Sequence, residues 1–396
     1  MKIGIFTDTY VPDINGVVTV IRLMERELRK LGHEVIVFAP AHPGAREEGR
    51  DVVRFRSVRF IFYSGMRVAL PYNRRAFSIL RSLDIVHSQD PFSVGLVGFW
   101  AAARYEIPHI HTYHTLYTEY RKYLPFPIRP SRRIVENLSR ILCNRCDAVI
   151  APSTSIQQEL LRYGVRVPIH VLPFGVDEEA FAQPEVWDLR QTLALPRHAA
   201  ILLYVGRLGW EKNVEFIIRS FKRIATVQPD TWLVLIGDGP SRPMLEKLVQ
   251  DLNLTNKVIF LGRISKEKLI DAYRQATLFV FASKTETQGL VVMEALTAGL
   301  PPVALNAMGV RDLIISGETG LLVEEDEQLF AEACLSLLTD PERRKAMGEA
   351  ARKWAMERNA RVSVLQLLEI YEAARARRAQ LSASLGSTKA DIRRRI

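Results

Sequence analysis

The chain has 396 residues, 48% of them hydrophobic and 25% charged, which is the balance of a folded globular protein and excludes disordered and fibrous classes. This length is too great for one ordinary core and favours two domains of about 170–200 residues each. Three cysteines are too few for a disulfide framework, and no apolar run approaches the roughly 18 residues that a membrane-spanning helix needs.

The start of the chain predicts a buried strand and not a secretory signal. The apolar run after Lys2 stops at Asp8, and no small-residue cleavage site follows it. Together with the few cysteines, this pattern predicts a cytoplasmic protein.

Charge is spread unevenly along the chain. Residues 1–175 hold 24 Lys and Arg against 15 Asp and Glu, residues 176–374 hold 23 against 28, and residues 375–396 hold 7 against 1. Because charge asymmetry bears on partners more than on fold, the basic first part indicates an anionic partner: a membrane surface, nucleic acid or an acidic substrate.

Strands and helices alternate through the first half. An apolar run at Lys2–Thr7 is followed by a polar loop, Asp8–Gly16, and by apolar residues at helical spacing from Val17 to Leu31, which Gly32 ends. Later apolar runs predict further strands at Glu34–Ala39, Ile85–His87, Ile107–His111, Ala148–Ala151 and Val167–Pro173. This alternation predicts an α/β domain with a parallel sheet covered on both faces.

A second series of the same kind opens at Ile201–Gly206. Its further strands are predicted at Trp232–Gly237, Val258–Leu261, Leu278–Ala282 and Pro302–Leu305, with helices at Val214–Ala225 and Leu290–Thr297 and a final helical stretch from Glu327 to Ser382. We therefore predict two Rossmann-like, doubly wound domains facing a cleft, at residues 1–175 and 176–365. Residues 366–396 are predicted to form a helix and basic tail that pack back towards the first domain. Such sheets bind ligands at the carboxyl ends of their strands.

The stretch Thr285–Gly299 carries two carboxylates, Glu286 and Glu294, around a transition from loop to helix. Backbone N–H groups at the start of a helix bind hydroxyls or phosphate oxygens, and a glycine such as Gly289 lets a ligand approach the backbone closely. A carboxylate at the position of Glu294 suits a bidentate grip on two ribose hydroxyls. Alternatively, both glutamates only solvate or cap the helix.

Two cations follow the first strand of the second domain. Arg207 comes directly after Gly206, and Lys212 stands five residues later. A rigid guanidinium and a compact ammonium at the carboxyl end of a strand can neutralise a diphosphate leaving group. The alternative is a solvated basic turn.

These motifs occur in one order: G-R-x4-K from Gly206, G-D-G-P from Gly237, F-L-G from Phe260, E-x7-E from Glu286 and the turn at Met308–Gly309. Over nearly the whole chain this order resembles family 4 of the retaining glycosyltransferases, which have the GT-B architecture. The resemblance implies that Arg207 and Lys212 hold the donor diphosphate and that Glu294 binds the ribose. It also implies that Glu286, with the backbone at Gln288, Gly289 and Leu290, holds the transferred sugar and its phosphates, and that Ile264 lies near the base.

In the first domain the resemblance places Gly16 against the donor phosphate, Asp13 towards the acceptor and His114 near the reacting sugar. Catalytic roles are thus implied for His114, Glu286, Arg207 and Lys212. His109 and His111 are expected to be structural.

The resemblance also implies a mechanism. The sequence contains no D-x-D loop, so Arg207 and Lys212 would take the place of a metal ion, and we expect neither a metal nor a cofactor. The acceptor would attack from the face that the diphosphate leaves, with retention of the α configuration, and the departing phosphate would accept the proton. Electrostatic stabilisation of that phosphate would be the main catalytic contribution.

Cys143 and Cys146 form one C-x-x-C pair within a predicted helix. A zinc site needs further ligands at matching spacing, and none is near, so we favour a structural role over metal binding or redox chemistry.

Two basic stretches bear on the acceptor. Residues 52–83 hold seven arginines and no acidic residue, interleaved with Phe55, Phe60, Phe62, Tyr63, Tyr72 and Phe77; residues 117–145 combine Tyr120, Tyr123, Phe126 and Ile128 with further basic residues. Such composition suits an anionic membrane surface. The alternative is that the aromatic side chains fill the core of the first domain. A stripe of apolar residues at helical spacing runs from Ile134 to Leu142, and for this stripe we favour packing into the core. Nucleic acid would suit similar residues, but the remaining motifs favour sugar transfer.

Two sequence motifs resemble those of diacylglycerol glucosyltransferases: T-Y-H-T-L-Y-x-x-Y (Thr112–Tyr120) and S-K-T-E-T-Q-G-L (Ser283–Leu290). We therefore expect UDP-glucose as donor and 1,2-diacylglycerol as acceptor, at the inner face of the cell membrane. Three alternatives remain: transfer to phosphatidylinositol or a polysaccharide, a nucleotide-sugar 2-epimerase on the same fold, and a non-catalytic sugar-nucleotide or polyanion binder.

Overall fold

The computed structural model describes residues 1–45, 49, 51–60, 67–124 and 126–394, and leaves undescribed the side chains of Tyr120, Tyr123 and residues 381–394. The chain forms two compact units. Unit 1 comprises Met1–Phe174 and Arg361–Ile396, and unit 2 comprises Gly175–Ala360. Each unit is described by itself.

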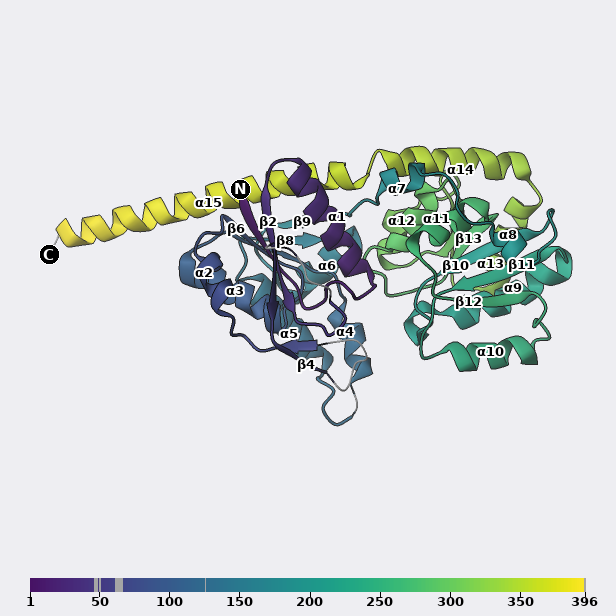
Figure 1. Ribbon diagram of the computed structural model, residues 1–396, viewed down its shortest axis with the longest axis horizontal. Coiled ribbons are helices and arrows are strands. Elements are labelled where there is room, and N and C mark those ends of the chain that lie inside the picture. Colours follow the sequence, from purple (N-terminus) through teal and green to yellow (C-terminus); the bar gives the residue numbers. More distant parts are fainter. Residues whose placement is uncertain (46–48, 50, 61–66, 125, 395–396) are drawn as a thin grey trace. The chain divides into compact units, whose positions relative to one another are not determined.

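Unit 1 is built on a parallel seven-stranded sheet with the order β3-β2-β1-β6-β7-β8-β9. Its strands are β1 (Lys2–Phe6), β2 (Glu34–Pro40), β3 (Val52–Phe55), β6 (Ile85–Ser88), β7 (His109–Thr112), β8 (Ala148–Ala151) and β9 (Ile169–Val171). The central strands are buried on both faces because helices cover both sides of the sheet. The predicted doubly wound arrangement is confirmed (Figure 1).

The helices of unit 1 follow from right-handed crossovers between parallel strands. They are α1 (Gly16–Lys30), α2 (Arg74–Leu80), α3 (Ser93–Tyr105), α4 (Tyr117–Tyr120), η1 (Arg121–Tyr123), α5 (Arg132–Cys143) and α6 (Thr154–Tyr163). The crossover β1–α1–β2 runs towards one edge of the sheet, whereas β6–α3–β7 and β7–α5–β8 run towards the other. Helices α3 and α5 therefore cover the same face, opposite to α1.

The stretch at residues 52–83 is more deeply folded into unit 1 than we expected. Phe55 on β3 is fully buried, and Arg54 donates hydrogen bonds to the carbonyl oxygens of Pro40 and Val11. A hairpin of β4 (Ser57–Arg59) and β5 (Arg67–Ala69) follows β3. Tyr72 is exposed, Phe60 and Phe77 are half-buried, and Phe62 and Tyr63 lie outside the described residues.

The prediction that the apolar stripe Ile134–Leu142 packs into the core is wrong for three of its residues. Leu142 and Ser139 face inward, but the side chains of Ile134, Leu138 and Ile141 are 58%, 53% and 48% exposed. Apolar residues occur on more than one side of this helix, so periodicity alone did not distinguish the side that meets the sheet.

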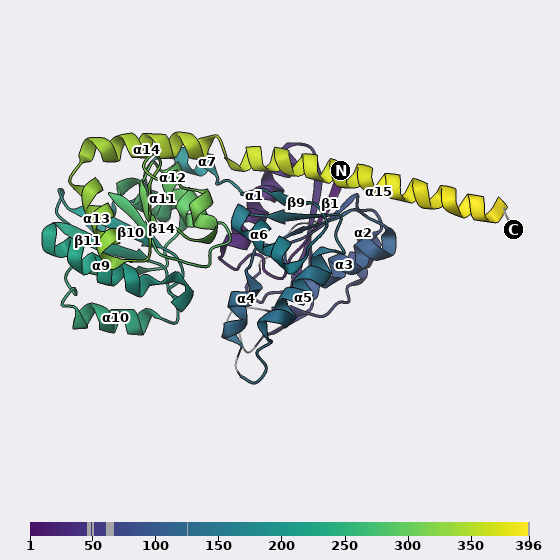
Figure 2. The same ribbon diagram turned by 180° about the vertical axis from the view of Figure 1, so that it is seen from behind.

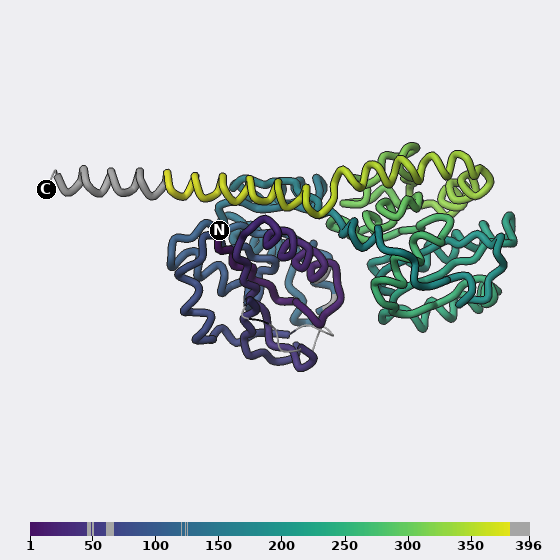
Figure 3. The backbone as a smooth tube through the Cα atoms, turned by 45° about the horizontal axis from the view of Figure 1, so that its top comes forward, coloured from purple at the N-terminus to yellow at the C-terminus, as the bar shows by residue number. Residues whose placement is uncertain are grey.

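The last helix, α15 (Ala360–Arg394), returns to unit 1 (Figure 3). It contacts His87, which points to the opposite sheet face from His109, and His109 meets Phe99 of α3, so α15 packs on the face that carries α1. The Tyr371 hydroxyl lies 2.7 Å from His87 Nδ1, and Arg378 donates to Asp147 at 3.2 Å. Residues more than 200 positions apart in sequence thus share one core.

Unit 2 is a parallel six-stranded sheet with the order β12-β11-β10-β13-β14-β15. Its strands are β10 (Ala200–Val205), β11 (Thr231–Ile236), β12 (Val258–Gly262), β13 (Leu278–Phe281), β14 (Pro302–Leu305) and β15 (Leu321–Val323). Its helices are α7 (Glu178–Ala182), α8 (Leu189–Thr192), η2 (Trp210–Lys212), α9 (Val214–Val227), α10 (Arg242–Asp251), α11 (Lys266–Gln275), α12 (Leu290–Thr297), η3 (Met308–Asp312), α13 (Glu327–Leu338) and α14 (Pro341–Met356). The view from behind shows the central strands of this unit between its helices (Figure 2).

In neither unit does a described helix combine the length and the apolar character that crossing a bilayer requires.

The backbones of the loops that follow β10 and β11 touch at glycine. A Cβ atom on Gly237 would lie 1.9 Å from the carbonyl oxygen of Gly206, and Gly237 has a φ of +130°. We predict that Gly237→Ala destabilises unit 2 by about 3 kcal/mol, because it adds both backbone strain and a clash. Urea unfolding of the variant checks this expectation.

Gly317→Ala is the matched control. Gly317 also has a positive φ, +90°, but no atom lies within 4 Å of its added Cβ. It should cost only about 1 kcal/mol. Equal losses in the two variants would contradict the close approach of the two loops.

Candidate active site

The predicted cations of unit 2 stand at the carboxyl end of its sheet. Arg207 follows β10 and Gly206, and the Tyr204 hydroxyl donates to the Arg207 carbonyl oxygen at 3.1 Å. Lys212 ends the short helix η2 and forms an ion pair with Glu286. Their side chains are only 17% and 16% exposed, so each charge depends on its partner for stabilisation.

Backbone hydrogen bonds hold the neighbouring strand ends together. The Gly206 N–H donates to the Ile236 carbonyl at 3.0 Å, and the Gly237 N–H donates to the Gly262 carbonyl at 2.8 Å. The glycine-marked ends of β10, β11 and β12 are therefore joined to one another directly before Arg207 in the chain.

The loop that carries Glu286 is fixed by the turn at η3. The Gly309 N–H donates to the Glu286 carbonyl at 3.0 Å, and a Cβ on Gly309 would lie 2.3 Å from the Thr287 carbonyl oxygen. Only glycine permits this approach. The sequence marked Met308–Gly309 as a turn but did not indicate that it supports Glu286.

Helix α12 begins at the predicted backbone cradle. Gln288 is buried, Gly289 is the residue before the helix with φ +94°, and Leu290 is the first helical residue. This φ lies in the left-handed region, which glycine adopts without strain, so the backbone conformation is the reason for a glycine here. No atom approaches its added Cβ closer than 3.6 Å.

Glu294 lies one turn into α12, half-buried, and accepts a hydrogen bond from the Tyr273 hydroxyl at 2.9 Å. Burial raises the pKa of Glu294, while the Tyr273 hydrogen bond opposes the shift. Tyr273 belongs to α11, and the sequence did not single it out. Ile264 lies between β12 and α11 and packs, partly buried, on the core of unit 2.

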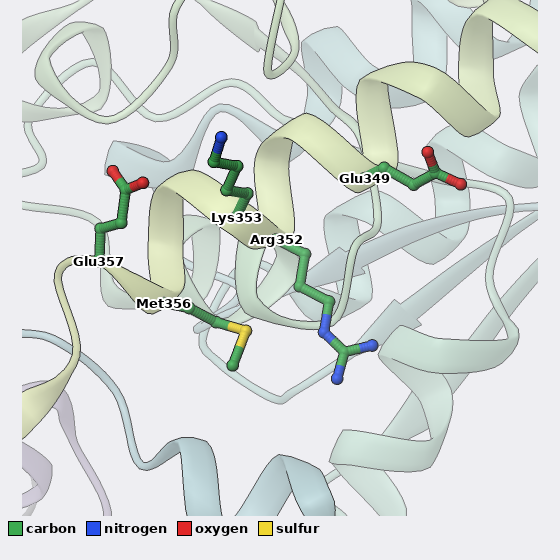
Figure 4. Close-up of a pocket in the computed structure, with 5 residues that line it drawn as sticks. All are labelled: Glu349, Arg352, Lys353, Met356 and Glu357. Atoms are coloured by element: carbon green, nitrogen blue, oxygen red, sulfur yellow. The ribbon is translucent and has the colours of Figure 1, made fainter.

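A hollow on α14 is separate from these residues. It is lined by Glu349, Arg352, Lys353 and Met356 of α14 and by Glu357, the residue after the helix (Figure 4). None of the predicted site residues contributes to it, so it is not the candidate site.

In unit 1 the predicted residues lie in the loop between β1 and α1. Gly16 is the exposed first residue of α1, and Asn15 caps the helix by accepting from the Val18 N–H. The Thr9 hydroxyl donates to Asp13 Oδ2 at 3.1 Å and accepts from Asn15 Nδ2 at 2.9 Å. Thr9 thus fixes Asp13 relative to the start of the helix.

His114 follows β7, and its Nε2 lies 2.7 Å from Gln89 Oε1. Burial lowers the pKa of His114 to about 3, with a further contribution from His111, so the imidazole is neutral at physiological pH. The sequence did not mark Gln89, although it follows β6, the neighbouring strand. His109 and His111 are buried and both contact the Ser88 hydroxyl, at 2.8 and 2.9 Å.

The three cysteines are buried. Burial raises the pKa of Cys143 to about 12. Within the described part of the chain, no group of three or more His, Cys, Asp or Glu residues is arranged to hold a metal ion.

A pair of aspartates at the same edge of the unit 1 sheet was also missed. Asp8 accepts from the Ser93 hydroxyl and the Val94 N–H at the start of α3, and Asp90 accepts from the Thr7 hydroxyl and the Asp8 N–H, both at 3.1 Å. Burial and the charge of Asp8 raise the pKa of Asp90 to about 7.

The raised pKa of Asp90 predicts a pH dependence of stability. Between its ordinary value of 3.8 and about 7 the folded state binds more protons than the unfolded state, so stability falls as pH rises through this window. Asp90→Asn should remove that part of the fall, because an amide oxygen accepts the same two hydrogen bonds without charge. Hydrogen exchange of β1 and β6 amides at several pH values measures it.

Asp51→Asn, at an exposed position, is the control and should leave the pH dependence unchanged. An unaltered dependence in Asp90→Asn would contradict the assignment.

Two family models match the chain. The model of the family described as Glycosyltransferase Family 4 matches residues 14–180, and that described as Glycosyl transferases group 1 matches residues 185–354. The alpha-monoglucosyldiacylglycerol synthase of Streptococcus pneumoniae is 35% identical over 352 residues, which cover 86% of this chain and 79% of the relative. A GDP-mannose-dependent alpha-mannosyltransferase of Mycolicibacterium smegmatis is 30% identical, over 96% of this chain and 99% of the relative.

Solved structures share the fold at low identity. A sucrose-phosphate synthase from Thermosynechococcus elongatus aligns with a TM-score of 0.76 and 23% identity, over 97% of this chain and 100% of that one. HepE of Anabaena in complex with UDP-glucose aligns with a TM-score of 0.74 and 18% identity, over 94% and 100%. With two Rossmann-like units of the GT-B type and matches across both, this chain is a glycosyltransferase and belongs to glycosyltransferase family 4.

Proposed function

We propose that this glycosyltransferase moves a hexose, glucose from UDP-glucose in the first instance, onto a membrane lipid such as 1,2-diacylglycerol, and forms an α-glycosyl lipid with retention. The observation that carries the proposal is the Lys212–Glu286 ion pair in the segment that follows β10 and also holds Arg207. The names of two relatives, the alpha-monoglucosyldiacylglycerol synthases of Streptococcus pneumoniae and Acholeplasma laidlawii, support the lipid acceptor.

Arg207 and Lys212 would bind the donor diphosphate. A guanidinium offers several fixed N–H donors and an ammonium a compact charge, and together they offset the negative charge that grows as the diphosphate departs. Lys212 is already neutralised by Glu286, so the arriving diphosphate would compete for its charge and release Glu286 towards the sugar hydroxyls. In this proposal the two cations perform the role of a divalent metal.

Glu294 would hold the ribose. Its carboxylate accepts one hydrogen bond from Tyr273 at Oε2 and, because a carboxylate has about four acceptor sites, retains capacity for two ribose hydroxyls. Tyr273 thereby fixes the orientation of the carboxylate. The first turn of α12, after Gly289, would donate backbone N–H groups to phosphate and sugar oxygens, with Ile264 near the base.

Unit 1 would serve the acceptor. Asp13 would face the acceptor hydroxyl, Gly16 at the start of α1 would contact the donor phosphate, and His114 would stay neutral beside the sugar. The acceptor hydroxyl would attack from the face that the diphosphate leaves, and the departing phosphate would take its proton. A protein base is then not required. The protein would act at the inner face of the cell membrane, with unit 1 towards the anionic surface.

Mass spectrometry of lipid products tests this function. The protein is incubated with diacylglycerol and with UDP-glucose, other UDP-sugars or GDP-mannose, with and without a chelator. We expect a monoglucosyl lipid from UDP-glucose that forms equally well with the chelator. GDP-mannose is included because mannosyltransferases occur among the relatives.

Transfer from GDP-mannose and from no other donor would show that the donor is GDP-mannose and not UDP-glucose. Exchange of a sugar proton with solvent in the absence of acceptor would point instead to a 2-epimerase. No transfer from any donor would contradict the proposal.

Substitutions test the cation pair. Arg207→Ala and Lys212→Ala should each lower kcat/KM for UDP-glucose by roughly 100-fold, because a charge that stabilises the leaving group is lost. The KM for the lipid acceptor should change little, and separate titrations of donor and acceptor measure both. Glu286→Gln should impair sugar use while leaving binding of free UDP in place.

Lys222→Ala is the control, since Lys222 is an exposed lysine of α9 in the same unit. It should behave like the wild type. A larger effect of Arg207→Ala on acceptor than on donor titration would contradict the assignment.

A further inference from the structure

Helix α5 presents an apolar stripe to solvent. Ile134, Leu138 and Ile141 lie at positions i, i+4 and i+7, so they share one side of the helix, and each is about half exposed. The opposite side packs inward through Ser139, Leu142 and Cys143, and Leu142 and Cys143 are also apolar. Helix α5 therefore carries apolar residues on two sides, one packed inward and one exposed to solvent.

Arginines border this stripe. Arg133 and Arg140 precede Ile134 and Ile141 by one residue and are exposed, and neither forms an ion pair within the described part of the chain. Arg132, which lies on the same side of the helix as Ser139 and Cys143, pairs with Glu136. The stripe is thus lined by positive charge on a helix whose acidic side chain is already neutralised.

Helix α3 also exposes large apolar side chains followed by an arginine. Leu96 and Trp100 lie one turn apart, 49% and 45% exposed, and Arg104 follows on the same side. Because α3 and α5 arise from successive crossovers in one direction, they lie on the same sheet face, and both views of the ribbon draw them as neighbours (Figures 1 and 2). Trp100 also contacts Phe77, which contacts the exposed ring of Tyr72.

We propose that this surface, the α3–α5 face defined by Leu96, Trp100, Ile134, Leu138 and Ile141 with Arg104, Arg133 and Arg140, docks onto an anionic lipid bilayer. The apolar side chains would enter the boundary between headgroups and acyl chains, and the arginines would bind lipid phosphates. A second copy of the chain is less well matched as the occupant, because a symmetric contact would bring the same arginines against one another. The inference rests on the proposed lipid acceptor and names the surface that would reach it.

Vesicle sedimentation tests the docking face. Wild-type protein should bind vesicles of phosphatidylglycerol and phosphatidylcholine, bind vesicles of phosphatidylcholine alone weakly, and dissociate as salt is raised. The triple variant Ile134→Gln, Leu138→Gln, Ile141→Gln should bind at least roughly tenfold more weakly, and Arg133→Gln with Arg140→Gln should lose mainly the salt-sensitive part.

Matched controls come from the opposite face of the same sheet. Leu365 on α15 is 44% exposed, and Arg377 on α15 is exposed. Leu365→Gln and Arg377→Gln should bind vesicles like the wild type. Equal losses in these controls would overturn the proposal, since binding would then depend on overall charge or hydrophobicity.

A labelled variant gives a second readout that is insensitive to partial unfolding elsewhere. The three native cysteines are buried, so an environment-sensitive fluorophore can be attached selectively to Leu138→Cys or Leu365→Cys. Anionic vesicles should shift the emission of the first label to the blue and leave the second unchanged. No shift at residue 138 while the protein sediments with vesicles would overturn the assignment of the face.

Two further outcomes separate this inference from the proposed function. If α5 were instead the contact with a second copy of the chain, the triple variant would convert a dimer to a monomer in sedimentation velocity, and the docking face would be refuted. Vesicle binding does not depend on turnover, so bound protein without glycosyl transfer would refute the function alone. Transfer to a detergent-dispersed acceptor with no vesicle binding would refute the docking face alone.

Discussion

Charge compensation at the carboxyl end of β10 is the interaction on which the candidate chemistry depends. Lys212 and Glu286 are largely shielded from water, and each would be costly to retain without the other. The loop that carries Glu286 is held by the Gly309 N–H, at a close backbone approach that requires glycine, and a similar close approach joins Gly237 to Gly206, the residue before Arg207. In the proposed function, the negative charge of a diphosphate would replace that of Glu286 beside Lys212, so binding of the donor would not leave the buried cation without a partner.

At the carboxyl end of its own sheet, the described part of unit 1 has buried polar residues and not an ion pair of this kind. Its polar residues are buried and less charged: His114 is neutral, and the pKa of Asp90 beside Asp8 is raised to about 7. Burial, more than any ion pair, sets these properties. The edge of unit 2 is therefore suited to a highly charged ligand, whereas that of unit 1 is suited to hydroxyl groups.

The α3–α5 face of unit 1 exposes apolar and basic side chains that do not pack against the sheet. Apolar residues on α3 and α5 remain exposed although both helices also bury apolar residues on their inward sides, and arginines border the exposed ones. Large exposed apolar surfaces normally mark an interaction site, because they cost free energy in water. This surface and the polar edge belong to the same unit, which is consistent with a domain that takes its acceptor from a lipid phase.

The sequence by itself determined the strand order along the chain, the two sheets and the loops that carry Gly16, Arg207, Lys212, Glu286 and Glu294, because apolar runs, helix starts and glycines with positive φ are local properties. Tertiary structure alone decided which distant groups meet. Asp8 and Asp90, Tyr273 and Glu294, and His87 and Tyr371 come from separate elements, and no local pattern encodes their distance. It also decided that Ile134, Leu138 and Ile141 face solvent, since a helix with apolar residues on two sides does not reveal in its sequence which side the sheet covers.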